Sequence, residues 1–141
     1  MKTKTGKIDA ESSTVLSVSP FEQDHVAVYQ ILTRSKWTKL KVKTSTTLAL
    51  ALVALEKIRI PVMLVERDLS PGSWRDLLEH SARLPSPPLL IVTSLLADER
   101  LWAEALNLGA WDVLAKPFDA QEVCRVVEGA WQRWRNQHDV R

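Results

Sequence analysis

The sequence predicts an α/β fold class, with a single doubly wound, five-stranded parallel sheet and helices on both faces. Three observations predict it. Short β-prone or apolar runs alternate five times with segments of helical periodicity, and the connections between them are short. The runs over 62–65 and 89–92 are apolar without polar alternation, which is typical of parallel strands covered on both sides. No internal repeat or low-complexity segment interrupts the alternation.

Composition places the chain among single-domain proteins without a polyanionic partner. It has 141 residues and a net charge of +2, which is too small to indicate nucleic-acid binding by itself. The single cysteine, Cys124, cannot form an intrachain disulfide, and no apolar run is long enough for a signal peptide core or a membrane span. We therefore expect a cytoplasmic protein without membrane contact, comprising a mobile leader (1–12), one domain (13–135) and a mobile tail (136–141).

The elements of the first half follow from strand propensity and from one helix-start signal. Ser19 as N-cap, Pro20 at the first helical position and Glu22 three residues after the cap predict a capping box. The elements expected in this half are a strand over 14–18, a helix from Pro20 to about Thr33, a half-exposed edge strand over 40–43 and a helix over 46–57.

The second half carries clearer helix boundaries. Ser73 with Asp76, and Asp119 with Glu122, predict two further helix starts, and Gly109 predicts a helix end with a left-handed cap. The elements expected here are strands over 62–65, 89–92 and 113–115, and helices from Trp74 to about Arg83, from Asp98 to Gly109 and from Asp119 onward.

Polar residues that follow the predicted strands are the candidates for a functional site. In doubly wound sheets, ligand and reaction sites lie beyond the carboxyl ends of the strands. An acid, Glu66, and a lysine, Lys116, should meet at this edge because both stand at strand ends there. The residues that we place there are Ser19, Pro20, Glu66, Thr93, Ser94 and Lys116.

The segment from Gly109-Ala110 to Lys116-Pro117-Phe118, which closes the alternating pattern, resembles the receiver domain of two-component response regulators. The resemblance covers about Thr14 to Arg133 and implies strand order 2-1-3-4-5. In that family the carboxyl edge holds a phosphorylated Asp, a magnesium-binding acidic pair, a Thr or Ser, and a Lys. The resemblance assigns the hydroxyl role to Thr93 and the lysine role to Lys116, and it suggests a cis peptide bond between Lys116 and Pro117.

Other positions depart from the family pattern. With Leu69 on the family's apolar position, Glu66 stands where the phosphorylated Asp belongs; with Pro71 as the anchor, Arg67 would stand there instead. We prefer Glu66 because the apolar run ends directly before it. Asp68 is a candidate for a displaced acceptor, and the aromatic switch residue of the family is replaced by Val113.

These departures predict a degenerate phosphoacceptor site. Glu is longer than Asp by one C–C bond, roughly 1.5 Å, which misplaces an attacking oxygen but lets Glu66 reach Lys116 directly. We therefore predict a Glu66–Lys116 ion pair. Ser19-Pro20 replaces the acidic pair, so we expect no magnesium, no other cofactor, no catalytic residue and no enzymatic activity. Glu22 and Asp24 lie close enough to swing toward the crevice, but Glu22 is assigned to the capping box.

Aromatic residues near the end of the chain predict a protein-binding surface. The resemblance implies that the helix from Asp98 to Gly109, the strand over 113–115 and the helix from Asp119 onward meet partners or a second copy of the chain. A histidine kinase contact is compatible with it. The alternative for the tryptophans is that they fill space between helix and sheet. The residues assigned to this interaction face are Trp102, Trp111, Trp131 and Arg125.

The sequence supports a receiver-like signalling and protein-interaction module of a two-component phosphorelay system. Two alternatives remain open: a functional phosphoacceptor that uses Asp68 or Glu66, and a nucleic-acid-binding protein that uses the basic last helix. His25, His80 and His138 have no metal-ligand spacing, and we expect them at the surface.

Overall fold

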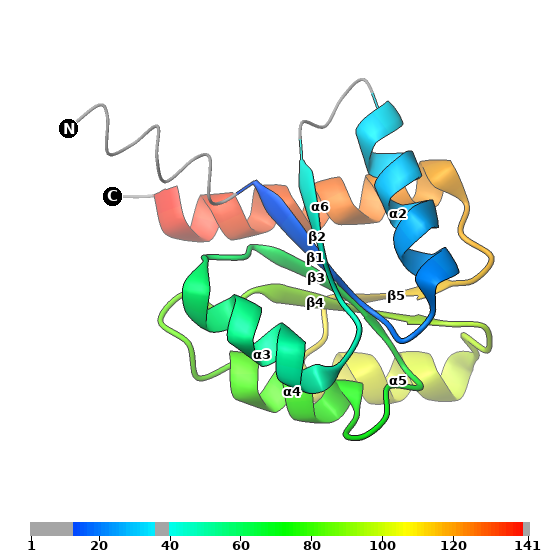
Figure 1. Cartoon of the computed structure of the whole chain (residues 1–141), viewed down its shortest axis with the longest axis horizontal. Coiled ribbons are helices and arrows are strands. Elements are labelled where there is room, and N and C mark those ends of the chain that lie inside the picture. Colours follow the sequence, from blue (N-terminus) through cyan, green and yellow to red (C-terminus); the bar gives the residue numbers. More distant parts are fainter. Residues whose placement is uncertain (1–12, 36–39, 140–141) are drawn as a thin grey trace.

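Five parallel strands form the centre of the molecule, and their order is β2-β1-β3-β4-β5 (Figure 1). The computed structural model describes residues 13–35 and 40–139, so the leader predicted over 1–12 lies outside the described residues. The fold class and the strand order predicted from the sequence are confirmed. The strands are β1 (Thr14–Val18), β2 (Lys41–Ser45), β3 (Val62–Glu66), β4 (Leu89–Ser94) and β5 (Asp112–Ala115).

Helices cover both faces of the sheet in two layers. In Figure 1, α2 and α6 lie on one side of the strands, and α3, α4 and α5 lie on the other. The helices are α2 (Glu22–Arg34), α3 (Leu48–Lys57), α4 (Trp74–Ser81), α5 (Glu99–Leu108) and α6 (Ala120–Asp139).

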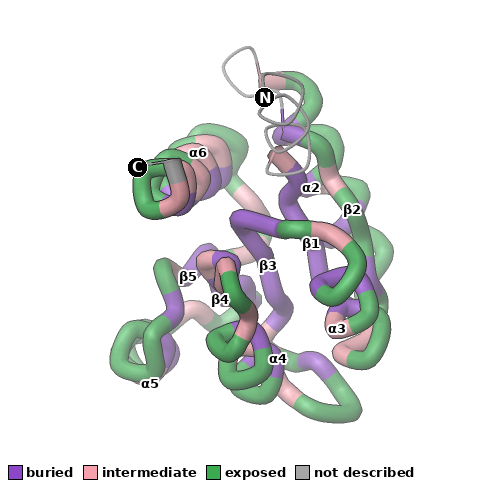
Figure 2. The backbone as a smooth tube through the Cα atoms, turned by 90° about the vertical axis from the view of Figure 1, so that its left-hand side faces the viewer, coloured by how far each residue is buried: buried purple, intermediate pink, exposed green. Residues whose placement is uncertain are grey.

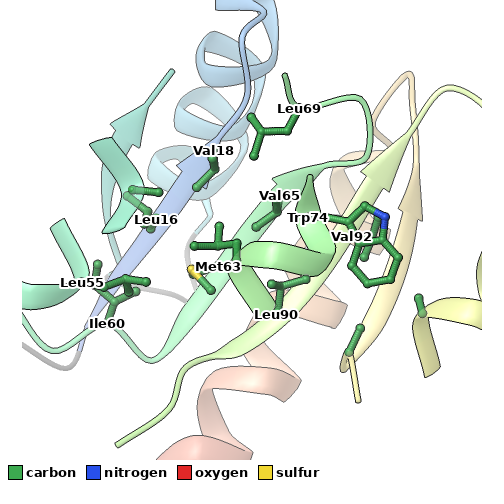
Figure 3. Packing of buried hydrophobic residues seen from close by; sticks show 14 of the residues in the cluster. Leu16, Val18, Leu55, Ile60, Met63, Val65, Leu69, Trp74, Leu90 and Val92 are labelled. Carbon is green, nitrogen blue, oxygen red and sulfur yellow. The ribbon is translucent and has the colours of Figure 1, made fainter. Parts of the chain in front are cut away.

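The core has two parts, one on each face of the sheet, because successive strand residues point to opposite faces. In β3, Met63 and Val65 belong to the cluster under α3, α4 and α5, whereas Val62 and Leu64 belong to the cluster under α2 and α6. Figure 3 shows Met63 and Val65 in the same cluster as Trp74, which is fully buried. Burial on both faces, visible in Figure 2, explains the continuous apolar sequence of β3.

Several predicted boundaries are confirmed by their capping contacts. Ser73 and Asp76 form the capping box of α4, and Asp98 caps α5 through the N–H group of Leu101. Gly109 ends α5 in the left-handed conformation, with φ of 107°. At the sheet edge, β2 is half-exposed as predicted.

The start of α2 differs from the prediction. The helix begins at Glu22, its N-cap is Phe21, and no side chain caps it. The Ser19 hydroxyl instead accepts a hydrogen bond from the Phe21 N–H group at 3.0 Å. The predicted capping box with Glu22 is therefore wrong, because the chain makes a serine turn before it enters the helix.

The last helix continues through residues 136–139, which we had assigned to a tail. Its end is supported by His138, which donates from Nδ1 to the Trp134 carbonyl at 2.8 Å and stacks on the Trp134 ring with a centroid distance of 4.2 Å. Among the helices of the described residues, none is long and apolar enough to cross a membrane.

Candidate functional site

The register of the sheet brings the predicted site residues to one edge. Glu66, the last residue of β3, pairs with Thr93 of β4, and the Lys116 N–H group donates to the Ser94 carbonyl at 2.9 Å. Parallel strands end on the same side, so these three strand ends place their side chains around one crevice. The peptide bond between Lys116 and Pro117 is cis, as the family resemblance suggested.

Lys116 and Glu66 form the predicted ion pair. The Nζ atom of Lys116 lies 2.5 Å from Oε1 of Glu66. The Lys116 side chain is 8% exposed and that of Glu66 is 2% exposed, so the pair is shielded from water. The other oxygen of Glu66, Oε2, accepts a hydrogen bond from the Asp68 N–H group at 2.8 Å, which fixes the carboxylate in position.

A second carboxylate, Asp24, enters the same site. Its Oδ2 atom accepts one hydrogen bond from Lys116 Nζ at 2.8 Å and another from the Ser19 hydroxyl at 2.7 Å. The sequence places Asp24 near the crevice but predicts no contact for it. A signal was present, because Asp24 lies four and eight residues before Val28 and Leu32, and all three side chains are on the buried face of α2.

The charges of this cluster hold Lys116 in its protonated form. Burial lowers the pKa of Lys116, but hydrogen bonds from Lys116 to Asp24 and Glu66, together with their negative charges, outweigh burial and raise the pKa above its usual value. The ammonium group also lies 5.1 Å from the centroid of the Phe21 ring, which adds a cation–π contact. Two carboxylates around one ammonium leave a net charge of about −1 on the cluster.

These oxygens do not fit a magnesium site of the kind that the fold family implies. Oδ2 of Asp24 and Oε1 of Glu66 both bind the Lys116 ammonium, and Oε2 of Glu66 is bound by a backbone N–H group. A Mg²⁺ ion needs oxygen ligands in octahedral geometry, and here a resident cation already occupies the space between the carboxylates. Within residues 13–35 and 40–139, no group of three or more His, Cys, Asp or Glu side chains is arranged to hold a metal ion.

His25 is buried beside the crevice and contacts Ser17 and Ser19. Our expectation that it lies at the surface is therefore wrong. It is 4% exposed. Its Nε2 atom donates to the Ser19 carbonyl at 2.9 Å, and its Nδ1 atom lies 2.9 Å from the Ser17 hydroxyl. His25 therefore ties the end of β1 to α2 and fixes the turn from which Ser19 reaches Asp24.

Asp68, the candidate for a displaced acceptor, lies outside the cluster. Its side chain is 64% exposed and pairs with Arg67 at 3.3 Å. Both residues line a polar hollow between α4 and α5, which does not include Lys116. The loop after β3 therefore turns Asp68 toward a different part of the surface from the one that Glu66 faces.

The remaining candidate positions are buried, except for Pro20. Thr93 and Ser94 are 3% and 1% exposed, and the Ser94 hydroxyl accepts a hydrogen bond from the Leu96 N–H group at 3.0 Å. Val113, at the switch position, is part of the core under α3, α4 and α5. Pro20 is exposed and offers the crevice no side-chain ligand.

The residues predicted as an interaction face do not form one patch. Trp102 lies in the first turn of α5 and Trp111 lies beyond the end of that helix, with 38% and 37% exposure. Trp131 packs on the core under α2 and α6, and Arg135 lies 5.0 Å from its ring centroid. Arg125 lines a hollow between α2 and α6. The face predicted from α5, β5 and α6 therefore retains only Trp102 and Trp111 as its exposed aromatics.

Comparisons with known proteins identify the fold. No family model matches the chain, and no curated protein matches it. The signal receiver domain of an HD domain-containing protein from Pseudomonas fluorescens Pf-5 is similar in structure, with a TM-score of 0.79 and 21% identity, over 92% of this chain and 93% of that one.

Two further solved structures agree with this result. A CheY-like receiver domain from Methanospirillum hungatei JF-1 gives a TM-score of 0.77 at 18% identity, over 89% of this chain and 98% of that one. The chemotaxis response regulator CheY4 of Vibrio cholerae gives 0.73 at 17% identity, over 84% and 98%. The chain therefore has the fold of response regulator receiver domains.

Proposed function

We propose that this chain is a receiver-like module of two-component signalling that works through protein contacts and is not phosphorylated. The receiver fold supports the first part of the proposal. The observation that carries the second part is the buried cluster in which Lys116 is bound by both Glu66 and Asp24.

The chemistry of phosphoryl transfer supports this reading. An acceptor carboxylate must approach the phosphorus atom while a dication and a lysine stabilise the transferred group. In this chain both oxygens of Glu66 already accept hydrogen bonds, and its partner Lys116 is shared with a second carboxylate. Phosphorylation of Glu66 would have to break a buried ion pair, and the carboxylates of residues 13–35 and 40–139 offer no arrangement for a dication that would compensate for that loss.

The same cluster gives the module a fixed conformation. The ion pair joins the ends of β3 and β5, and the contact with Asp24 ties both of them to α2. In a phosphorylated receiver the lysine would meet the phosphoryl group, so Glu66 supplies a permanent anionic partner in its place. A partner protein or a second copy of the chain would bind this fixed state near the exposed Trp102 and Trp111.

Treatment with a small-molecule phosphodonor tests the proposal. The protein is incubated with acetyl phosphate and Mg²⁺, and its intact mass is measured at once after an acid quench, beside an active receiver domain as positive control. We expect the mass to stay unchanged while the control gains one phosphoryl group. A stable gain of one phosphoryl group, mapped to Glu66 or Asp68, would establish the phosphoacceptor alternative instead.

A further inference from the structure

An apolar hollow opens directly above the charged cluster. It has a volume of about 330 Å³ and lies between the start of α2, the end of β4 and the turn after β5. Its lining residues include the apolar Phe21, Leu95 and Phe118. Asp24 and Lys116 also line it, and they join the hollow to the ion-pair cluster.

The rim of this hollow exposes large apolar side chains to water. Leu95 is 77% exposed and Phe21 is 41% exposed. The neighbouring Leu96 is 58% exposed, although it lines the separate hollow between α4 and α5. Contiguous apolar side chains around a concave site are typical of a surface that a partner covers.

The charge of the hollow indicates which partner group fits. Asp24 offers a second oxygen, Oδ1, that accepts no hydrogen bond from the described residues, since Lys116 and Ser19 both donate to Oδ2. The Lys116 charge is balanced by Glu66 on the side away from the hollow, because Glu66 is not part of its lining. An anionic group would therefore be repelled by the Asp24 carboxylate, whereas a cationic group would neutralise it.

We propose that this hollow binds an arginine side chain of a partner protein, with the guanidinium group between the aromatic walls and in contact with Asp24. A guanidinium group is planar, stacks on aromatic rings and donates hydrogen bonds to carboxylates, while its alkyl stem suits the apolar rim. The inference rests on the proposed function, because it names the partner group that the interaction module would recognise.

Binding of a short peptide to the intact protein tests this inference. The probe is the capped tripeptide Leu-Arg-Leu, titrated into isotope-labelled protein and followed by NMR chemical shifts. We expect saturable shifts at Phe21, Leu95 and Phe118, with a dissociation constant on the order of 1 mM. The same peptide with citrulline, which keeps the shape but loses the charge, should bind about tenfold more weakly.

Two leucine variants provide a matched control that leaves the ion-pair cluster intact. Leu95→Lys places a cation at the rim of the hollow and should abolish the shifts, whereas Leu96→Lys adds the same charge next to it and should preserve them. Both side chains are exposed, so both variants should fold.

Four outcomes would overturn the inference. Three are an absence of saturable shifts, equal binding of the arginine and citrulline peptides, and equal loss in both leucine variants. The fourth is binding of free arginine as tight as that of the peptide, which would reassign the hollow to a small molecule. A phosphoryl adduct in the mass experiment would defeat the proposed function alone, because it leaves the peptide result as measured.

Discussion

At the scale of single residues, buried ion pairs occupy the position at which the receiver family has its phosphoacceptor site. Lys116, Glu66 and Asp24 are almost fully buried, and each one has a charged partner within hydrogen-bond distance. Removal of any one member leaves the others buried without their full set of partners, which costs far more than the loss of an exposed pair.

Substitutions of Asp24 and Glu22 test which acid in the first turn of α2 contributes to the stability of the protein. Both lie in the first turn of α2, but Asp24 is buried against Ser19 and Lys116 while Glu22 is exposed. We expect Asp24→Asn to lower the free energy of unfolding by about 1–3 kcal/mol, and Glu22→Gln to change it by less than about 0.5 kcal/mol. Urea unfolding followed by tryptophan fluorescence measures both. Equal effects would mean that Asp24 acts only through the helix dipole.

Lys116 contributes a stabilisation that is lost at alkaline pH. Its folded-state pKa is raised, because hydrogen bonds and charges from Asp24 and Glu66 outweigh the effect of burial. The unfolded lysine titrates near pH 10.4. The associated stabilisation is therefore complete below about pH 10.4 and is lost as the pH rises through the higher folded-state pKa.

The variant Lys116→Met separates the stabilisation by Lys116 from the effects of other groups that titrate at high pH. At neutral pH, we expect Lys116→Met to lower the free energy of unfolding by about 3–5 kcal/mol, because two buried carboxylates lose their cation. The difference between the wild type and the variant should narrow above about pH 10.4. Urea unfolding from pH 8 to pH 12 measures it, with Lys57→Met at an exposed position as control. A difference that stays constant over this range would contradict the linkage.

At the scale of elements, the boundaries that follow local rules are the ones that the sequence predicts correctly. The capping box of α4 and the cap of α5 each need only a few adjacent residues, so neighbouring side chains decide them. At the start of α2, the Ser19 hydroxyl accepts a hydrogen bond from the Phe21 N–H group and donates one to Asp24, which also binds the distant Lys116. Local capping rules do not include that contact.

Alanine substitutions at two glycines distinguish a requirement for a left-handed backbone conformation from an effect of helix propensity. Gly109 has φ of 107°, whereas Gly129 lies within α6, and a Cβ atom at either position meets no atom within 4 Å. We expect Gly109→Ala to destabilise the protein by about 1–2 kcal/mol, because an L side chain is strained in the left-handed region. Gly129→Ala should stabilise it by about 0.5–1 kcal/mol. Thermal unfolding of both variants measures this; the same sign in both would contradict the backbone argument.

At the scale of the whole molecule, the sheet gathers its unusual features at one edge. The ion-pair cluster and the apolar hollow both lie at the carboxyl ends of the strands, where doubly wound folds bind ligands. Arg125 and Trp131 lie elsewhere, on the side of α6 that faces α2. The position of a residue along a helix does not show which neighbouring element its side chain will contact. The place of these two residues could therefore be known only from the tertiary structure.

The sequence alone determined the fold class from its apolar runs and, through the family resemblance, the strand order. The Glu66–Lys116 pair followed because both residues stand at strand ends on one edge of the sheet. The tertiary structure alone decided that Asp24 joins this pair, that His25 is buried, and that Asp68 faces away. Successive residues of a helix point about 100° apart. Asp24 shares one face of α2 with Val28 and Leu32, and only the packing of that helix on the sheet brings its carboxylate within reach of Lys116.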